Sequence, residues 1–256
     1  MVIEVDAEAL DRLGPVWYYR YGFEGPALPG HQRVYLVPPR FDKERLIRAL
    51  NEHPESWWLV GNEPNDPHQD NLSPGAYAVF YHRFLETVKR ARRPYFVATA
   101  GLANADWRWA QRFLDSYRAQ FGEAPRVDAW NIHNYLLEPD RDPLDVAEFR
   151  RRILAFREWM ARVGEGDKPL FLTEFGVLYS TGRDGEPLDP ARVEAYIHET
   201  VGWLATTDYV QRWAWFANRT AGQFNGDLYD EQDRLTRYGV AYRDAIAAVV
   251  GHGTRE

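Results

Sequence analysis

Short apolar runs alternate with longer amphipathic stretches along most of the chain. The short runs have the length and the β-branched and aromatic content of buried strands. They cover residues 15–22, 33–39, 56–64, 95–101, 127–135, 169–177 and 210–218. The stretches between them predict helices over residues 7–13, 42–53, 74–92, 105–121, 143–164, 190–206 and 236–250. This alternation predicts a parallel sheet, and runs that are apolar on both sides predict that helices cover it.

Seven strands are visible, and the stretch "VIEV" at residues 2–5 is the best candidate for an eighth. No Gly-rich phosphate loop of an open doubly wound sheet is present. We therefore expect an α/β fold with a single domain over residues 1–256, a (β/α)8 TIM barrel whose first β/α unit is short or incomplete. The longest expected loops, all but one of which directly follow a strand, would gather at the C-terminal face where such barrels place their sites. These loops cover residues 22–31, 64–73, 135–143, 178–189 and 218–235.

Composition removes several classes of function. The net charge is −7, from 38 acidic and 31 basic side chains, which is not the footprint of a nucleic-acid-binding protein. The chain has no Cys, so disulfides and thiolate metal sites are excluded, and its His residues show no metal-ligand spacing. We expect neither a metal nor another cofactor. The N-terminal residues lack a signal-peptide pattern and no segment has the length of a membrane span, so we expect a soluble protein without a membrane partner. We also expect a monomer. Its compartment stays open.

Two of the buried strands end in a glutamate. Glu63 follows "WWLVGN" and Glu174 follows "PLFLT". An ionised carboxylate at such a position costs several kcal/mol, in round terms, unless it is paired or reaches water. Each could simply cap a helix or pair with one of the many Arg residues. Two of them, with Asn62 beside the first and with His133 and Tyr135 at a third strand end, favour a catalytic site instead.

Paired carboxylates across a cleft carry out glycosidic bond cleavage. One carboxylic acid protonates the leaving oxygen while the other carboxylate attacks the anomeric carbon, and a separation of about 5 to 5.5 Å gives net retention of configuration. Aromatic rings can carry the apolar face of a sugar. The pattern therefore predicts a retaining reaction on a glycan substrate.

The stretches "GNEP", "IHNY", "TEFG" and "WAWFAN" resemble clan A of the glycoside hydrolases. Over residues 16–246 the finer pattern is similar to glycoside hydrolase family 128 and to the related Asl1-type catalytic core. This resemblance implies that Glu63 is the acid/base, that Glu174 is the nucleophile and that Asn62 contacts the 2-hydroxyl of the sugar. It also implies that His133 and Tyr135 form the His-x-Tyr pair beside the nucleophile.

The resemblance implies further that Trp215 or Trp213 is the aromatic platform. We also expect Tyr18, Trp17 and Trp107 as candidate platforms, with core packing as the alternative for each. Further substrate-binding candidates are Arg20 and Asn218.

Two positions depart from the family pattern. Arg20 stands where Asn is frequent, and Asn134 stands between His133 and Tyr135 where Trp is common. Both changes fall in substrate pockets, so the β-1,3-glucan specificity of family 128 does not follow from the resemblance.

We therefore expect a retaining glycoside hydrolase that cleaves a β-linked glycan, such as an internal linkage of β-glucan. A transglycosylase would use the same site, because it differs only in how well water competes for the covalent intermediate. A carbohydrate-binding barrel without activity is the other alternative, and it is disfavoured because both carboxylates are present. New reducing ends from a panel of β-glucans would separate an enzyme from a binding protein.

Overall fold

A computed structural model of the chain describes residues 7–14, 17–179, 187–220 and 224–253. Seven strands alternate with helices, and every strand and helix predicted within these ranges is present, most of them shorter at the ends. The strands are β1 (Trp17–Arg20), β2 (Gln32–Val37), β3 (Ser56–Asn62), β4 (Tyr95–Gly101), β5 (Trp130–Asn134), β6 (Leu170–Phe175) and β7 (Val210–Trp215). The helices are α1 (Ala7–Asp11), α2 (Lys43–Glu52), α3 (Pro74–Val88), the 3₁₀ turn η1 (Ala103–Ala105), α4 (Trp107–Phe121), α5 (Val146–Arg162), α6 (Pro190–Ala205) and α7 (Arg237–Gly253).

The strand predicted at residues 2–5 lies outside the described residues. None of the helices in the described ranges has both the length and the apolar content needed to cross a membrane.

Short polar side chains begin five of the helices. Each accepts a hydrogen bond from a backbone N–H of the first turn, which would otherwise lack a partner. The residues are Asp42 before α2, Ser73 before α3, Asp106 before α4, Asp145 before α5 and Asp189 before α6. Pro74 and Pro190 follow two of these caps, and proline is favoured at the first position of a helix. The starts of α3 and α6 can therefore be read from the sequence.

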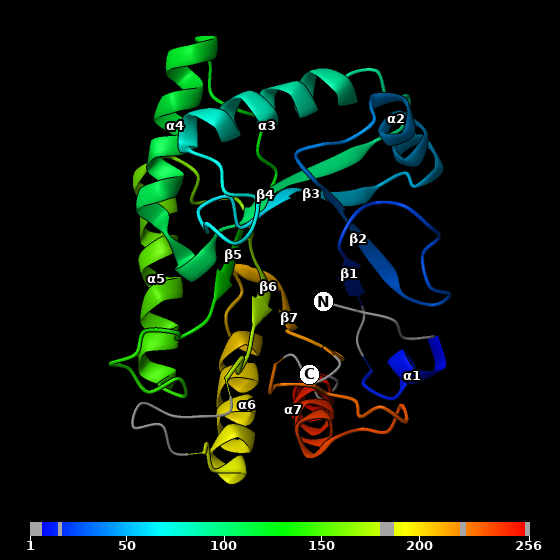
Figure 1. Cartoon of the computed structure of the whole chain (residues 1–256), viewed down its shortest axis with the longest axis vertical. Helices are drawn as coiled ribbons and strands as arrows, with labels where there is room; N and C mark the ends of the chain where they lie inside the picture. The colour runs from blue at the N-terminus through cyan, green and yellow to red at the C-terminus, as the bar shows by residue number, and fades with distance from the viewer. Residues whose placement is uncertain (1–6, 15–16, 180–186, 221–223, 254–256) are drawn as a thin grey trace.

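All described strand pairs are parallel. Strands β1 to β4 form one sheet in chain order, and β5 to β7 form another. Two isolated bridges, Ala98 with Ala129 and Leu102 with Ile132, join β4 to β5. The helices lie outside the strands, as Figure 1 shows. This arrangement confirms the α/β fold with parallel strands and alternating helices, and it brings the C-terminal ends of the strands to one side.

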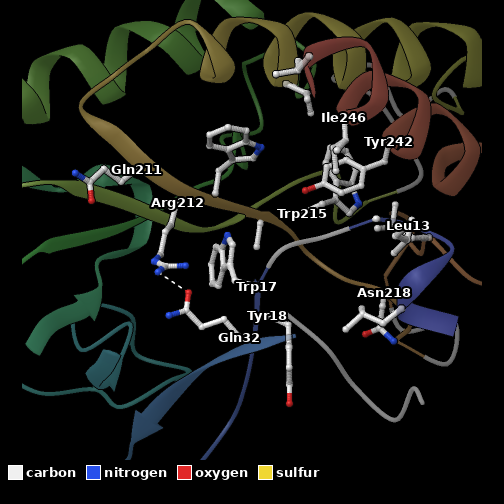
Figure 2. A pocket seen from close by; sticks show the side chains of 17 residues that line it. Leu13, Trp17, Tyr18, Gln32, Gln211, Arg212, Trp215, Asn218, Tyr242 and Ile246 are labelled. Atoms are coloured by element: carbon white, nitrogen blue, oxygen red, sulfur yellow. Dashed lines mark hydrogen bonds between the residues drawn. The ribbon is translucent and has the colours of Figure 1, made fainter. Parts of the chain in front are cut away.

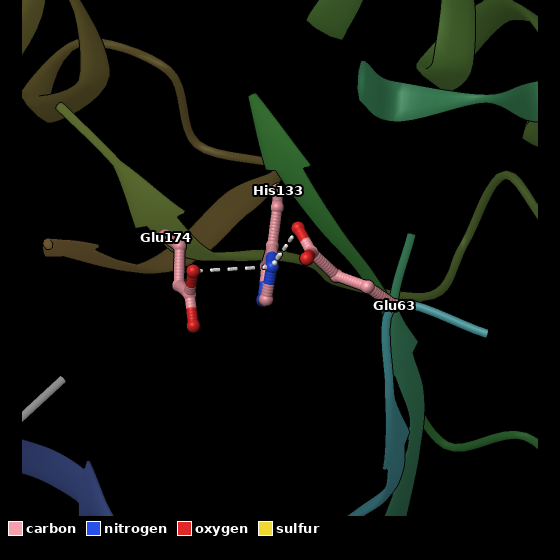
Figure 3. A group of neighbouring side chains, drawn as sticks. All are labelled: Glu63, His133 and Glu174. Carbon is pink, nitrogen blue, oxygen red and sulfur yellow. Dashed lines mark hydrogen bonds and ion pairs between the residues drawn. The ribbon is translucent and has the colours of Figure 1, made fainter. Parts of the chain in front are cut away.

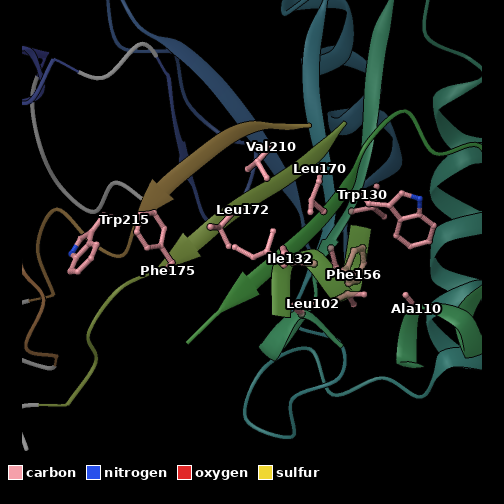
Figure 4. Close-up of a cluster of buried hydrophobic side chains, with 14 of the residues drawn as sticks. Leu102, Ala110, Trp130, Ile132, Phe156, Leu170, Leu172, Phe175, Val210 and Trp215 are labelled. Carbon is pink, nitrogen blue, oxygen red and sulfur yellow. The ribbon is translucent and has the colours of Figure 1, made fainter. Parts of the chain in front are cut away.

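Two apolar layers hold the fold together. A small cluster inside the curve of the strands contains Trp17, Tyr19, Val34, Leu36, Leu59, Ala98, Ala129 and Phe171. A much larger cluster lies between the strands and the helices, and Figure 4 shows the part of it around β5, β6 and β7. Because both faces of the strands are buried, apolar residues occupy consecutive positions rather than alternate ones.

The two outer strands β1 and β7 share no hydrogen-bonded register in the described part of the chain. They are bridged by Arg212, whose guanidinium donates to Gln32 at 2.7 Å and lies 5.5 Å from the centre of the Trp17 ring. Next to this bridge is a mainly apolar cavity of about 460 Å³ (Figure 2). Neither Glu63 nor Glu174 lines it, so this cavity is separate from the predicted catalytic groups.

Candidate active site

The end of β3 holds Glu63 in an unusual backbone conformation. Gly61 has φ of +95° and Glu63 has φ of +43°, so the chain turns sharply where the strand ends. A Cβ on residue 61 would lie 2.9 Å from an oxygen of Asp70, which explains the glycine. The Asp70 carboxylate accepts from the Asn62 backbone N–H at 2.6 Å, and the Glu63 N–H donates to Gly101 O at 3.0 Å. These contacts fix the direction of the Glu63 side chain.

A bulge between β5 and β6 brings two consecutive residues of β6 to the site. Ile132 pairs with Leu172 and His133 pairs with Glu174, so Thr173 is an extra residue on the β6 side. The His133 ring contacts both Thr173 and Glu174. Simple alternation along a strand would send one of these two side chains to the opposite face.

His133 lies between the two glutamates. Its Nδ1 is 2.9 Å from Glu63 Oε1 and 3.4 Å from Glu174 Oε2 (Figure 3). One carboxylate oxygen of each glutamate and one ring nitrogen of His133 lie within 4.8 Å of one another. Glu63 is 8% exposed, Glu174 is 7% exposed and His133 is 1% exposed. The three residues form one buried polar cluster with limited access to water.

Two tyrosine hydroxyls hold the Glu174 carboxylate. Tyr19 donates to Oε1, and Tyr135 donates to Oε2 at 2.7 Å, the contact expected for Tyr135 from the sequence. Burial, followed by the negative charge of Glu174, raises the pKa of both tyrosines well above 10. The hydroxyls therefore stay protonated over the working pH range of an enzyme, and both Glu174 oxygens face hydrogen-bond donors.

Opposing effects act on the His133 ring. Burial lowers its pKa, but the charge of Glu174 and the hydrogen bond and charge of Glu63 outweigh burial, so the pKa of His133 is raised. The ring occupies the space beside Gly101, where a Cβ would lie 2.0 Å from His133 Nε2. Glycine at position 101 is thus a steric requirement for His133.

The same three side chains, Glu63, His133 and Glu174, have the donor types of a metal site. Each donor also has a hydrogen-bonding protein partner at 3.0 Å or less, since His133 Nδ1 contacts Glu63 and Tyr135 contacts Glu174. All three side chains therefore take part in hydrogen bonds, an arrangement that suits proton transfer.

Several other predicted site residues lie away from this cluster. Tyr18 is 2% exposed and its hydroxyl accepts from the Leu28 N–H, so it packs on the side of β1 opposite to Tyr19. Arg20 follows on the same side of β1 as Tyr18, where its charge acts on Arg33. Neither side chain contacts Glu63 or Glu174 in the described structure.

The predicted tryptophan platforms also face elsewhere. Trp215 is 2% exposed, donates to Gly226 O at 2.7 Å and packs on Phe175 and Tyr242. A ring so deeply buried cannot stack on a sugar, so that expectation is wrong for Trp215.

The remaining candidates also lie outside the cluster. Trp213, Trp17 and Asn218 line the apolar cavity between β1 and β7. Trp107 lies at the start of α4 under the guanidinium groups of Arg108 and Arg162.

Other residues reach the site that the sequence did not single out. Tyr19 donates a hydrogen bond to Glu174, and the half-buried Phe216, just beyond β7, packs edge-on against Tyr135. Gln69 accepts from the Asn62 side chain at 3.1 Å, beside the Asp70 contact to the Asn62 backbone. The signal for Asp70 was the acidic stretch "DPHQDN" that follows Glu63, but its target was not visible in the sequence.

Comparisons with known proteins identify the family of this chain and structures that share its fold. The family described as glycosyl hydrolase catalytic core matches residues 9–242. The search of curated protein sequences found no match.

Three solved structures share the fold. One is an endo-β-1,3-glucanase of glycoside hydrolase family 128 from Pseudomonas viridiflava, with 22% identity, a TM-score of 0.72 and coverage of 93% of this chain and 94% of that chain. Another is an endo-β-1,3-glucanase from Amycolatopsis mediterranei in complex with laminaritriose, with 20% identity, a TM-score of 0.68 and coverage of 93% of each chain.

The third is a curdlan-specific exo-β-1,3-glucanase from Blastomyces gilchristii in complex with glucose. It has 22% identity and a TM-score of 0.67, and the match covers 93% of this chain and 94% of that chain. Because the family match extends over most of the sequence, this chain belongs to the glycosyl hydrolase catalytic core family.

Proposed function

We propose that this protein is a retaining glycoside hydrolase that cleaves β-1,3-linked glucan by double displacement, with Glu63 as the acid/base and Glu174 as the nucleophile. The proposal includes a (β/α)8 barrel. The observation that carries it is the pair of carboxylates on either side of His133, with one oxygen of Glu63 within 4.8 Å of one oxygen of Glu174. This spacing suits direct attack on the anomeric carbon rather than a water held between the two carboxylates.

The different partners of the two carboxylates support the assignment of roles. Glu174 accepts from Tyr19 on one oxygen and from Tyr135 on the other, which favours an ionised, fixed carboxylate. Glu63 faces His133, a group that can exchange a proton with it. An ionised nucleophile and a proton-carrying acid are what retention requires.

In the first step, an oxygen of Glu174 bonds to the anomeric carbon as the bond to the leaving oxygen breaks, and Glu63 donates its proton to that oxygen. In the second step, Glu63 takes a proton from water, the water oxygen bonds to the anomeric carbon and the bond to Glu174 breaks. Tyr19 and Tyr135 stay protonated throughout, so one of them can hold the non-attacking oxygen of Glu174 in place.

The substrate assignment rests on the relatives and on the rim of the site. The three similar structures are β-1,3-glucanases, and one of them holds laminaritriose. Tyr21 lies at this rim, directly beyond β1, and is 59% exposed. Partial burial, followed by the negative charge of Asp70, raises the pKa of the Tyr21 hydroxyl. An exposed ring next to the catalytic edge suits stacking on a glucose unit.

The test is to incubate the protein with soluble β-1,3-glucan, β-1,4-glucan and β-1,4-xylan and to measure new reducing ends. We expect cleavage of the β-1,3-glucan, with the β-anomer appearing first in the NMR spectrum of the products. Glu63→Gln and Glu174→Gln are the matched inactive controls. Binding of the glucan without cleavage would contradict the proposal, and products longer than the substrate would indicate transglycosylation instead.

A further inference from the structure

A line of two buried polar side chains continues from His133 away from the carboxylates. His133 Nε2 lies 3.0 Å from Thr173 Oγ1, and Thr173 Oγ1 lies 2.9 Å from Asn131 Oδ1. Both Thr173 and Asn131 are completely buried. The bulge in β6 places Thr173 beside His133. Ile132 pairs with Leu172 and His133 pairs with Glu174, so Thr173 is the extra, unpaired residue between them.

The number of hydrogens on each side chain determines which groups donate. A threonine hydroxyl has one hydrogen, and Thr173 donates it to the amide oxygen of Asn131. The Thr173 oxygen can then only accept from the His133 ring. With the Asn131 amide oriented so that its oxygen faces Thr173, His133 Nε2 carries the hydrogen.

This has a consequence at the other ring nitrogen. Nδ1 faces Glu63 Oε1 at 2.9 Å and Glu174 Oε2 at 3.4 Å. If the ring is neutral, its hydrogen is already on Nε2, and Nδ1 can only accept a proton from the Glu63 carboxylic acid. If Nδ1 is also protonated, the ring is an imidazolium and Glu63 is ionised. In either state the pair of Glu63 and His133 holds one proton in addition to the one on Nε2.

We propose that Thr173 and Asn131 are positioning residues that keep the hydrogen of neutral His133 on Nε2, so that Glu63 and His133 together hold the proton that the leaving oxygen receives. This inference rests on the proposed function, because it assigns the source of that proton. After the first step the proton is on the leaving group, Glu63 is ionised and the glycosyl group is bonded to Glu174. Water returns the proton to the pair in the second step.

The other titratable groups around the ring are consistent with this assignment. Glu63 approaches from β3, Glu174 from β6, Tyr135 from just beyond β5 and Tyr19 from β1. Asp70 adds a further negative charge on the Glu63 side. Both tyrosines stay neutral donors, and the two carboxylates raise the pKa of the buried ring, so they favour a proton held at Nδ1.

Removing the Thr173 hydroxyl would free the ring. A neutral His133 could then move its hydrogen to Nδ1 and donate it to an ionised Glu63, and the pair would be stable with one proton fewer. Activity would then be lost at a lower pH on the alkaline side. Thr173→Val has nearly the same shape without the hydroxyl, and Thr173→Ser keeps the hydroxyl.

The experiment combines two readouts on wild type, Thr173→Val and Thr173→Ser. Long-range ¹H–¹⁵N NMR of protein labelled with ¹⁵N-histidine reports which nitrogen of His133 carries the hydrogen, with the signal assigned by its loss in His133→Gln. We expect neutral His133 to carry hydrogen on Nε2 in wild type and Thr173→Ser, and on Nδ1 in Thr173→Val. In Thr173→Val the alkaline limit of kcat/KM should fall by about one pH unit.

Thr200→Val is the matched control, since Thr200 is a buried threonine that donates to Tyr196 O inside α6. It should leave both readouts unchanged. Hydrogen on Nδ1 in the wild type, or identical tautomers and pH profiles for wild type and Thr173→Val, would overturn the inference. The tautomer is measured without substrate. A protein that cleaves no β-glucan would therefore refute the proposed function, while the NMR spectrum would still show whether Thr173 keeps the hydrogen of His133 on Nε2.

Discussion

His133 can lie between the two glutamates only because residue 101 has no side chain: a Cβ on Gly101 would lie 2.0 Å from His133 Nε2. The Gly101 carbonyl also accepts from the Glu63 N–H at 3.0 Å. One residue at the end of β4 thus positions Glu63 by a hydrogen bond and makes room for the histidine beside it.

We expect Gly101→Ala to push His133 away from Glu63 and Glu174. A displacement of about 1 Å at a catalytic group can cost about 100-fold in rate, so kcat/KM on β-1,3-glucan should fall by at least about that factor. Gly202→Ala, in α6 with open space around the new Cβ, is the control. It should keep full activity with equal or slightly higher stability. An active Gly101→Ala protein would show that the position of His133 is not critical.

The two tyrosines that hold Glu174 provide a second prediction. Tyr19→Phe and Tyr135→Phe each remove one hydrogen bond to a charged group, worth about 1.5 to 3 kcal/mol, so each should lower kcat/KM by about 10- to 100-fold. Tyr18→Phe is a closely matched control, because Tyr18 is adjacent in sequence but bonds to the Leu28 N–H outside the site. If Tyr18→Phe lost as much activity as Tyr19→Phe, the orientation of β1 would need revision.

The sequence predicts the strand ends well and the orientation of individual side chains less well. Glu63 and Glu174 end strands whose apolar runs are unmistakable, so their meeting at one edge of a parallel sheet follows from topology. Tyr18 and Tyr19 occupy a strand that is buried on both faces. The apolar pattern of such a strand does not say which of two adjacent residues faces inward, and in the structure it is Tyr19 that contacts Glu174.

The side chains around Glu63 and Glu174 could not be predicted, because contacts between distant segments of the chain place them. The Thr173 bulge depends on the register between β5 and β6, which no local pattern records. Asp70 reaches back to the Asn62 backbone from a loop, and Trp215 turns into the outer core while Phe216 takes the place beside Tyr135. The motifs therefore identify the strands that carry Glu63 and Glu174, and packing decides which side chains surround these two residues.

A charge network behind the site links stability to acidic pH. Hydrogen bonds from Arg151 and then from Arg152 outweigh the effect of burial and lower the pKa of Glu148 from 4.5 to about 2. Arg152 also donates to Tyr135 O at 3.0 Å. Because the pKa in the folded state is lowered, the stabilisation from Glu148 is fully present above about pH 4.5 and is lost as the pH falls toward 2.

We expect Glu148→Gln to lower the thermal midpoint at pH 7 and to weaken its dependence on pH between about 4.5 and 2. Glu158→Gln, an exposed position on the same helix, should follow the wild type. Thermal unfolding followed by circular dichroism at several pH values measures this. Parallel pH curves for wild type and Glu148→Gln would exclude Glu148 as the source of the dependence.

The donor set of Glu63, His133 and Glu174 leads to a prediction about metals. Since each donor is already engaged in hydrogen bonds, we expect activity after prolonged dialysis against EDTA to equal that before dialysis. Zn²⁺ should inhibit, because a metal on these atoms would displace the proton that catalysis uses. Loss of activity with EDTA and recovery with one divalent cation would point to a metal-dependent reaction.

The assignment of roles to the two glutamates is the central claim, and their variants should differ on two substrates. Glu174→Ala removes the covalent route and should lose turnover on every substrate. Glu63→Ala keeps the nucleophile, so an activated aryl glycoside should still form the glycosyl-enzyme. On a natural glucan, whose leaving group needs a proton, the loss in Glu63→Ala should be larger, by about 10² to 10⁴-fold.

The most direct measurement is the configuration of the glycosyl azide formed by each variant with the aryl β-glycoside, determined by NMR. In Glu63→Ala, azide should attack the glycosyl-enzyme and give the β-azide, with retained configuration. In Glu174→Ala, azide should enter the space left by the nucleophile and give the inverted α-azide. The opposite pattern, α-azide from Glu63→Ala and β-azide from Glu174→Ala, would show that the roles are exchanged, and undiminished activity in both variants would place the active site elsewhere.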